Sequence, residues 1–320
     1  MKPDITHMAR PSSRRILLML SLIVACERKA NSPATDSSAP AMPTPPDTPA
    51  PVSTRTGWDP MLGPVLVVSG DGQHDASVIF PMFSDSTLTD TTTFDTSILP
   101  GMSVDLFSRS GRLGAGRLRP ASPRVRDGCV AWPEASVTIA NPAARVGTWT
   151  VGFAAGRAVP FALDSLESLT GADSARLTVE VARLASTVPT DTAAAFRGIP
   201  FFVRQVWRFR TESGTEALIA NITRRINQEA NPREEQLLLV AERDGTRSDS
   251  RYATVYHERV SGQEEAIETT DVLAVVTLGP GGAPAIVLIR DYGDGSAYAL
   301  LTRTPTGEWH VGWSSAYAGC

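Results

Sequence analysis

Lysine is nearly absent from this chain of 320 residues, in which only Lys2 and Lys29 occur and every other Lys/Arg position is arginine. This shortage removes nearly every candidate for a catalytic amine. The formal net charge at pH 7 is −4. Because nucleic-acid-binding proteins contact phosphates through a basic patch, the acidic balance argues against nucleic acid as a partner.

Histidine and cysteine are also scarce, with four and three residues respectively. The chain has no HExxH or CxxC spacing that would indicate a zinc site, and no GxSxG stretch that would present a serine nucleophile. We therefore expect no metal, no cofactor and no catalytic residue of a familiar kind.

The apolar run near the N-terminus is too short to cross a membrane. It extends from Ile16 to Ala25, broken only by Ser21, whereas a membrane-spanning helix needs about 20 apolar residues. A basic segment precedes the run, which is typical of a secretory signal peptide. We expect residues 1–25 to be this peptide, and its removal makes the chain more acidic.

The residues Ile23, Val24, Ala25 and Cys26 resemble the lipobox of bacterial lipoproteins, where an aliphatic and a small residue precede an invariant cysteine. The resemblance implies cleavage before Cys26, diacylation of its sulfur and acylation of its amino group. Two or more acyl chains anchor a protein stably. Glu27 in place of aspartate implies sorting to the outer membrane of a Gram-negative cell, on its periplasmic or surface face. The alternative is an ordinary signal peptide with a nearby cysteine.

The segment 26–56 is rich in proline, serine and threonine. Such a composition cannot bury enough apolar surface to order itself. It tends toward extended polyproline geometry, which rises about 3.1 Å per residue. We expect a disordered tether that holds the folded part away from the membrane.

Two further cysteines, Cys129 and Cys320, remain once Cys26 is set aside. In an exported protein an even pair of thiols suggests a disulfide. This bond would close a very long loop, for which the chain-entropy account allows up to roughly 4–5 kcal/mol. Two free thiols too far apart to bond are the alternative.

Short apolar runs fill two long parts of the chain, residues 57–163 and 201–320. They are rich in valine, isoleucine, phenylalanine and tryptophan and are bounded by glycine, proline, serine and aspartate, which is typical of strands. The fold class that follows is mainly β (α+β). We expect an N-terminal β-rich domain over 57–163 and a C-terminal antiparallel β-meander over 201–320, separated by a helical segment over 164–200.

Helical spacing is confined to that separating segment. Asp164 with Glu167 fits a capping box, and Thr170 with Asp173 fits another. Apolar residues at helical spacing follow at Leu177, Val181 and Leu184. A second, shorter helix is expected over residues 191–197.

The stretch VRQVWRFR has the period of two that is typical of a half-buried strand. It places Val203, Trp207 and Phe209 on one face, and arginines on the other at positions 204, 208 and 210. Short connections favour antiparallel neighbours in this half. The meander can form a curled sheet, a barrel, or two propeller-like blades of four strands.

The last 52 residues, from Thr269 to Cys320, resemble the end of lipoproteins with FG-GAP-like repeats, through a glycine- and tyrosine-containing strand and the closing Trp313-Ser314-Ser315. The metal loop of that family falls here on residues 278–283, which carry no carboxylate. Calcium takes six to eight oxygen ligands, so the resemblance transfers no metal site. Asp291 and Asp294 are expected to be turn residues.

One loop brings an acid, a histidine and glycines together. Asp71, His74 and Asp75 follow the strand-like run PVLVV and are candidates for a catalytic loop. A hairpin turn that uses Asp-Gly explains the same residues.

Glutamates form the second set of candidates. Glu229 and Glu235, with Glu234, flank a connection through Asn231-Pro232, and paired carboxylates are the acid and base of glycoside hydrolysis. Alternatively they are solvated on polar loops, where surface ion pairs with neighbouring arginines contribute roughly 0–1 kcal/mol.

The sequence thus predicts a lipid-anchored protein of the bacterial cell envelope whose β-rich body binds or scaffolds an envelope protein or glycan without catalysis. The alternative is an envelope hydrolase that uses carboxylates or the His74 loop. Tryptophans and tyrosines of the C-terminal half are expected in the core; on an exposed face they would bind sugar or peptide instead.

Overall fold

The computed structural model of the chain describes residues 58–69, 74–83, 88–89, 92–122, 129–140, 148–189, 194–227, 232–279 and 281–319. The expected signal peptide, lipidation site Cys26 and tether lie outside these ranges, as do Asp71, Glu229 and Cys320. None of the helices within them has the length and apolar content of a membrane span. The predicted fold class is confirmed, because antiparallel strands dominate and α1 (Gly171–Thr187) interrupts them.

Six antiparallel strands form a closed barrel in the N-terminal half. They are β1 (Val65–Ser69), β2 (Asp75–Ile79), β3 (Ser103–Ser108), β4 (Gly111–Ser122), β5 (Glu134–Ile139) and β6 (Val151–Ala154). Their order is β1-β2-β5-β4-β3-β6, and β6 pairs back onto β1. A Cβ at Gly152 of β6 would lie 3.2 Å from Leu106 and 3.3 Å from Leu66, so these neighbours would have to shift to admit a side chain.

A second group of strands forms what we call the central sheet. Its members are β7 (Ala158–Phe161), β13 (Thr269–Leu278), β14 (Pro284–Asp291), β15 (Gly295–Arg303), β16 (Trp309–Ser314) and β17 (Ala318–Gly319). The order is β16-β15-β14-β13-β7, with β17 paired to β15. β7 falls within the predicted N-terminal domain by sequence, yet it pairs with β13 of the C-terminal half.

The remaining strands form the outer sheet. They are β8 (Asp164–Ser165), β9 (Phe202–Arg210), β10 (Thr215–Ile226), β11 (Arg233–Asp244) and β12 (Ala253–Gln263), in the order β12-β11-β10-β9-β8. The C-terminal meander therefore divides into two runs of consecutive strands, β9 to β12 and β13 to β16, which lie in different sheets.

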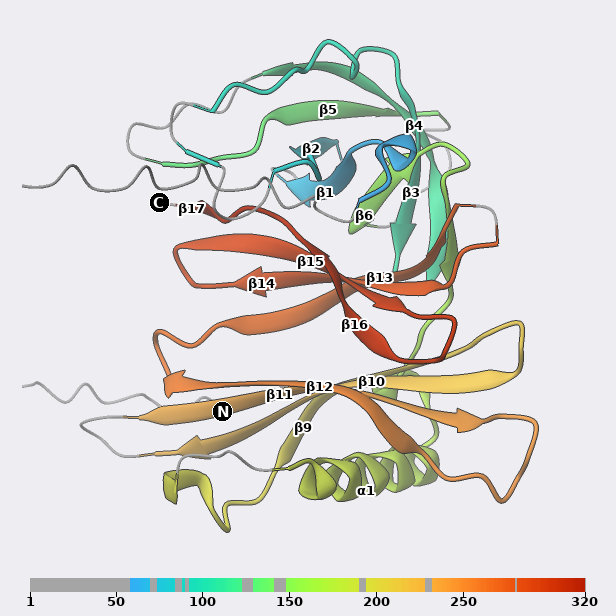
Figure 1. Cartoon of the computed structure of the whole chain (residues 1–320), viewed down its shortest axis with the longest axis vertical. Helices are drawn as coiled ribbons and strands as arrows, with labels where there is room; N and C mark the ends of the chain where they lie inside the picture. Colours follow the sequence, from blue (N-terminus) through green and yellow to red (C-terminus); the bar gives the residue numbers. More distant parts are fainter. Residues whose placement is uncertain are drawn as a thin grey trace, which may run out of the picture. The chain divides into compact units, whose positions relative to one another are not determined.

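The layers follow one another as barrel, central sheet, outer sheet and α1 (Figure 1). Alternate residues of one strand therefore enter different cores. In β14, Val287 packs in the core shared with the barrel and Ile286 in the core shared with the outer sheet. In β10, Ile219 packs toward the central sheet and Leu218 toward α1. Strands that are buried on both faces have nearly continuous apolar sequences.

The helix α1 begins where the second capping box predicts. Thr170 is its N-cap, and its hydroxyl accepts a hydrogen bond from the Asp173 amide (3.3 Å). Val181 and Leu184 are buried against the outer sheet, and the helix ends before Pro189. The N-terminal half of α1 is less buried than this C-terminal half.

The first capping box is wrong. Asp164 lies in β8, and its carboxylate accepts a hydrogen bond from Arg208 of β9 (3.2 Å). Only the short 3-10 helix η2 (Leu166–Ser168) follows it. Two more 3-10 helices occur, η1 (Pro60–Leu62) and η3 (Ala194–Phe196), the latter within the expected second helix.

The assignment of Val203 to the face of Trp207 and Phe209 is also wrong. The register between β9 and β10 shifts between Asn221 and Ile222, so one residue of β9 is skipped. This bulge turns Val203 toward α1, while Trp207 and Phe209 pack toward the central sheet. The core role of the aromatics is confirmed for Trp207, which is 4% exposed, and likewise for the buried Tyr252, Tyr298, Trp309 and Trp313.

Cys129 lies within the described residues and Cys320 outside them, so the predicted disulfide stays a prediction. Val130 and Gly319 form an antiparallel bridge with two hydrogen bonds of 3.0 and 2.7 Å. We expect peptide mapping under non-reducing conditions to find Cys129 linked to Cys320. Two alkylatable thiols in exported protein would contradict this.

Candidate functional site

The strands that flank the histidine loop, β1 and β2, form an antiparallel pair. Ser69 pairs with Asp75, His74 is exposed, and the Asp75 carboxylate accepts a hydrogen bond from the Ser136 hydroxyl (3.1 Å). Both strands belong to the barrel, which packs on the opposite face of the central sheet from the outer sheet. The structure therefore does not bring His74 and Asp75 together with Glu235.

Glu235 lies within β11 and is 1% exposed, so its placement on a solvated loop is wrong. Arg224 of β10 stands directly opposite, and its Nε donates to the Glu235 carboxylate (2.9 Å). Arg224 also lies over the Phe201 ring, 4.3 Å from its centroid. The ion pair with a neighbouring arginine was predicted correctly, but it is buried and not a surface pair.

Glu234, on the other face of β11, forms a similar ion pair with an arginine of β10. Arg225 pairs with it across the hairpin (Nη2–Oε2 2.6 Å), and Glu234 is 2% exposed. Both glutamates are thus held by arginines in a hairpin, and neither lines a described cavity of useful size.

The best-formed site lies elsewhere, between the N-terminal half of α1 and the outer sheet. A cavity of about 620 Å³ is found there, and we call it the arginine cavity. Five arginines line it against only two carboxylates, Asp173 and Glu180. The arginines are Arg176 and Arg183 of α1, Arg208 of β9, Arg243 of β11, and Arg251 in the connection that leads to β12.

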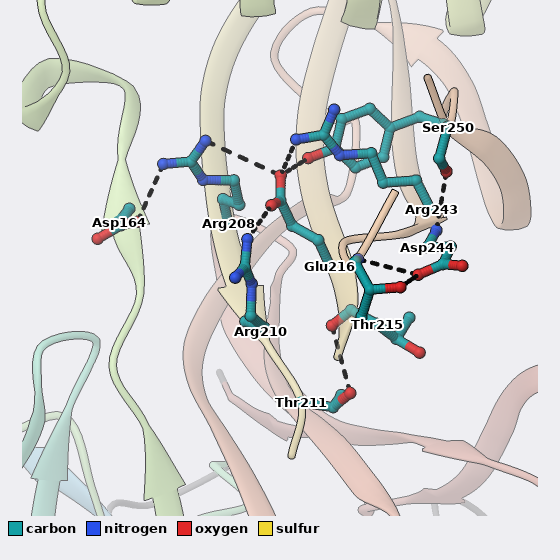
Figure 2. A network of polar contacts seen from close by, with 11 residues as sticks. Asp164, Arg208, Arg210, Thr211, Thr215, Glu216, Arg243, Asp244 and Ser250 are labelled. Atoms are coloured by element: carbon teal, nitrogen blue, oxygen red, sulfur yellow. Dashed lines mark hydrogen bonds and ion pairs between the residues drawn. The ribbon is translucent and has the colours of Figure 1, made fainter. Parts of the chain in front are cut away.

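A buried carboxylate organises the arginines on the sheet side (Figure 2). Glu216 of β10 is 4% exposed. Its two oxygens contact Arg210 (3.0 Å), Arg243 (2.8 Å) and Arg208 (3.9 Å). The Tyr252 hydroxyl donates a further hydrogen bond to it. Three cations therefore share one anion, which leaves this cluster positively charged.

The protonation states in this cluster follow from the same contacts. Burial opposes ionisation of Glu216, but hydrogen bonds from Tyr252 and Arg210 and the charge of Arg243 outweigh burial and lower the pKa of Glu216. Burial, followed by the hydrogen bond to Glu216, raises the pKa of Tyr252. At neutral pH Glu216 is an anion and Tyr252 a neutral donor.

Tyr252 is the residue around which the guanidinium groups gather. Arg183 Nη2 donates to its carbonyl oxygen (3.3 Å), and the Arg243 guanidinium lies over its ring, 4.7 Å from the centroid. Its hydroxyl contacts Glu216, which Arg208 also approaches. Side chains from α1, β9 and β11 thus meet at one wall of the arginine cavity.

A smaller cavity of about 410 Å³ adjoins the same cluster. Asp164, Arg208, Arg210 and Glu216 line it together with aromatic residues, including Phe161. Arg208 lines both cavities. Its contacts with Asp164 and Glu216 therefore hold β8 to the outer sheet beside the arginine cavity.

Sequence reasoning missed this site because its residues come from separate elements with no shared motif. The available signal was the polar face of VRQVWRFR, which places Arg208 and Arg210 on the same side of a strand. The pattern predicts a half-buried strand and gives no sign that its arginines meet a carboxylate. Their partner Glu216 is the one carboxylate of β10, a strand with an apolar centre, and a carboxylate is buried only when it is paired.

The described residues hold no group of three or more histidine, cysteine, aspartate or glutamate side chains that would bind a metal ion. Comparisons of the chain with protein-family models, with characterised proteins and with solved structures found no match.

Proposed function

We propose that this protein is a lipid-anchored protein of the bacterial cell envelope that binds an anionic ligand in the arginine cavity without transforming it. The observation that carries the proposal is the gathering of five arginines around about 620 Å³ of space in a chain whose net charge is negative. Guanidinium groups offer rigid forks of donors that match carboxylate and phosphate oxygens. The volume falls in the range of small-molecule sites.

Binding is favoured over catalysis by the state of the lining groups. Both lining carboxylates are paired with arginines of the same helix, Asp173 with Arg176 (3.0 Å) and Glu180 with Arg183 (2.6 Å). The Ser250 hydroxyl accepts a hydrogen bond from the Asp244 amide (2.9 Å), and the lining includes neither histidine nor cysteine. No base stands beside a nucleophile here, as covalent catalysis requires.

Arg251 provides the cleanest test of anion binding. It is exposed and makes no ion pair or hydrogen bond to another described residue, so its loss leaves the fold intact. We expect Arg251→Gln to weaken binding of inorganic phosphate about fivefold, since one rim charge contributes about 1 kcal/mol. Isothermal titration calorimetry at low salt measures this.

Arg247→Gln is the matched control, because Arg247 lies four residues earlier in the same connection and pairs outward with Asp249 (3.0 Å). It should bind phosphate as the wild type does. Equal affinities for wild type and Arg251→Gln, or equal losses in both variants, would exclude the arginine cavity as the binding site.

The anchor is tested separately from the ligand. Cys26→Ser removes the sulfur that would carry the diacyl group, so we expect the variant to incorporate no palmitate and to lose the acyl anchor. Cell fractionation with radiolabelled palmitate reports both effects. A variant that stays in the membrane fraction and still incorporates palmitate would contradict lipidation at Cys26.

A further inference from the structure

The arginine cavity and its buried cluster carry two positive charges in excess. Six arginines line the cavity or contact Glu216: Arg176, Arg183, Arg208, Arg210, Arg243 and Arg251. Four carboxylates face them: Asp164, Asp173, Glu180 and Glu216. In a chain of negative net charge, such a local excess attracts anions. A ligand with two negative charges would balance it.

The arrangement of the arginines favours a ligand that carries both negative charges on one chemical group. Arg183, Arg208 and Arg243 come from three elements and meet around Tyr252. A carboxylate offers two oxygens in one plane, which suits one guanidinium fork. A phosphate monoester offers three terminal oxygens in a tetrahedron, and these can accept from three directions at once.

The size of the cavity shows that phosphate alone does not fill it. About 620 Å³ is available, whereas one water occupies about 30 Å³ in the liquid. Leu169 and Leu177 contribute apolar wall beside the charged groups. The remaining space therefore suits the organic part of a ligand whose anionic end reaches the arginines.

We propose that the ligand of the arginine cavity is an organic phosphate monoester, bound as the dianion. This rests on the proposed function, because it specifies the anion that the same cavity takes. A soluble sugar phosphate and a lipid with a terminal phosphate monoester share this chemistry.

The test uses two probes, phenyl phosphate and its methyl ester methyl phenyl phosphate, which differ by one methyl group and one ionisable oxygen, titrated into the full chain in detergent at pH 8. We expect the monoester to bind at least tenfold more tightly than the diester. The second ionisation of a phosphate monoester lies near pH 6, so the preference should disappear at pH 5. Arg251→Gln should reduce monoester binding, and Arg247→Gln should not.

The outcomes separate the two proposals. If both probes bind equally and Arg251→Gln weakens both, anion binding stands and the preference for a dianion is overturned. If neither probe binds, and inorganic phosphate does not bind either, the proposed function fails as well. Where the monoester is preferred, glucose 6-phosphate and vesicles of phosphatidylcholine with phosphatidic acid distinguish a soluble ligand from a lipid headgroup.

Discussion

Glu235→Gln lowers the free energy of unfolding by about 3–5 kcal/mol, which is the usual cost of removing one partner of a buried ion pair. The side chains of Arg224 and Glu235 are only 6% and 1% exposed. Arg259 Nη1 also lies 3.8 Å from the Glu235 carboxylate. Without the carboxylate these guanidinium groups stay buried next to a neutral amide. Urea denaturation of the wild type and the variant measures the difference.

Two further variants make this prediction specific. Asp249→Asn breaks the exposed pair with Arg247, whose side chains are 66% and 71% exposed, and should change stability by less than about 0.5 kcal/mol. The double variant Arg224→Met, Glu235→Leu removes both charges and should recover much of the loss. A Glu235→Gln variant as stable as the wild type would show that the pair is not buried as described.

Glu216→Gln lowers stability less and changes the ligand site more. We expect a loss of roughly 1.5–3 kcal/mol, the range for hydrogen bonds to a charged group, because Arg210 and Arg243 reach solvent with side chains 60% and 30% exposed. Loss of the internal anion raises the positive charge of the arginine cavity. The variant should therefore bind phosphate more tightly than the wild type, by several fold.

The pH dependence identifies the group responsible. The pKa of Glu216 is lower in the folded protein than its ordinary value of 4.5, so the carboxylate stabilises the fold above that pH. This contribution is lost as the pH falls through the lowered folded-state pKa. The stability difference between wild type and Glu216→Gln should accordingly shrink below about pH 4.5. A difference that stays constant down to pH 3, or weaker phosphate binding by the variant, would contradict this role of Glu216.

Local sequence patterns predict the helix and the strands of this fold, because the formation of each of them depends mainly on residues that are close together in the sequence. The capping residue Thr170 and the spacing of Val181 and Leu184 locate α1, and turn residues separate the strands. Local sequence patterns do not predict which strands pair with one another. The closure of the barrel by β6 and β1, and the pairing of β7 with β13, are set by contacts between residues far apart in the chain.

The candidate site was less predictable than the fold for the same reason. His74 stands beside acids in the sequence, yet in the structure it is exposed directly before β2. Arg208 and Arg243 are 35 positions apart and come together only because β9, β10 and β11 are neighbours in the outer sheet. Glu216, on the middle strand of the three, receives both.

The most direct test of the central claim is a crystal structure of the protein grown with tungstate, a tetrahedral dianion with a strong anomalous signal. We predict an anomalous peak in the arginine cavity, within hydrogen-bonding distance of Arg183, Arg208 or Arg243. The peak should be absent at the same tungstate concentration in a variant in which Arg183, Arg243 and Arg251 are all glutamine. An empty arginine cavity in wild-type crystals that bind tungstate elsewhere would contradict the account.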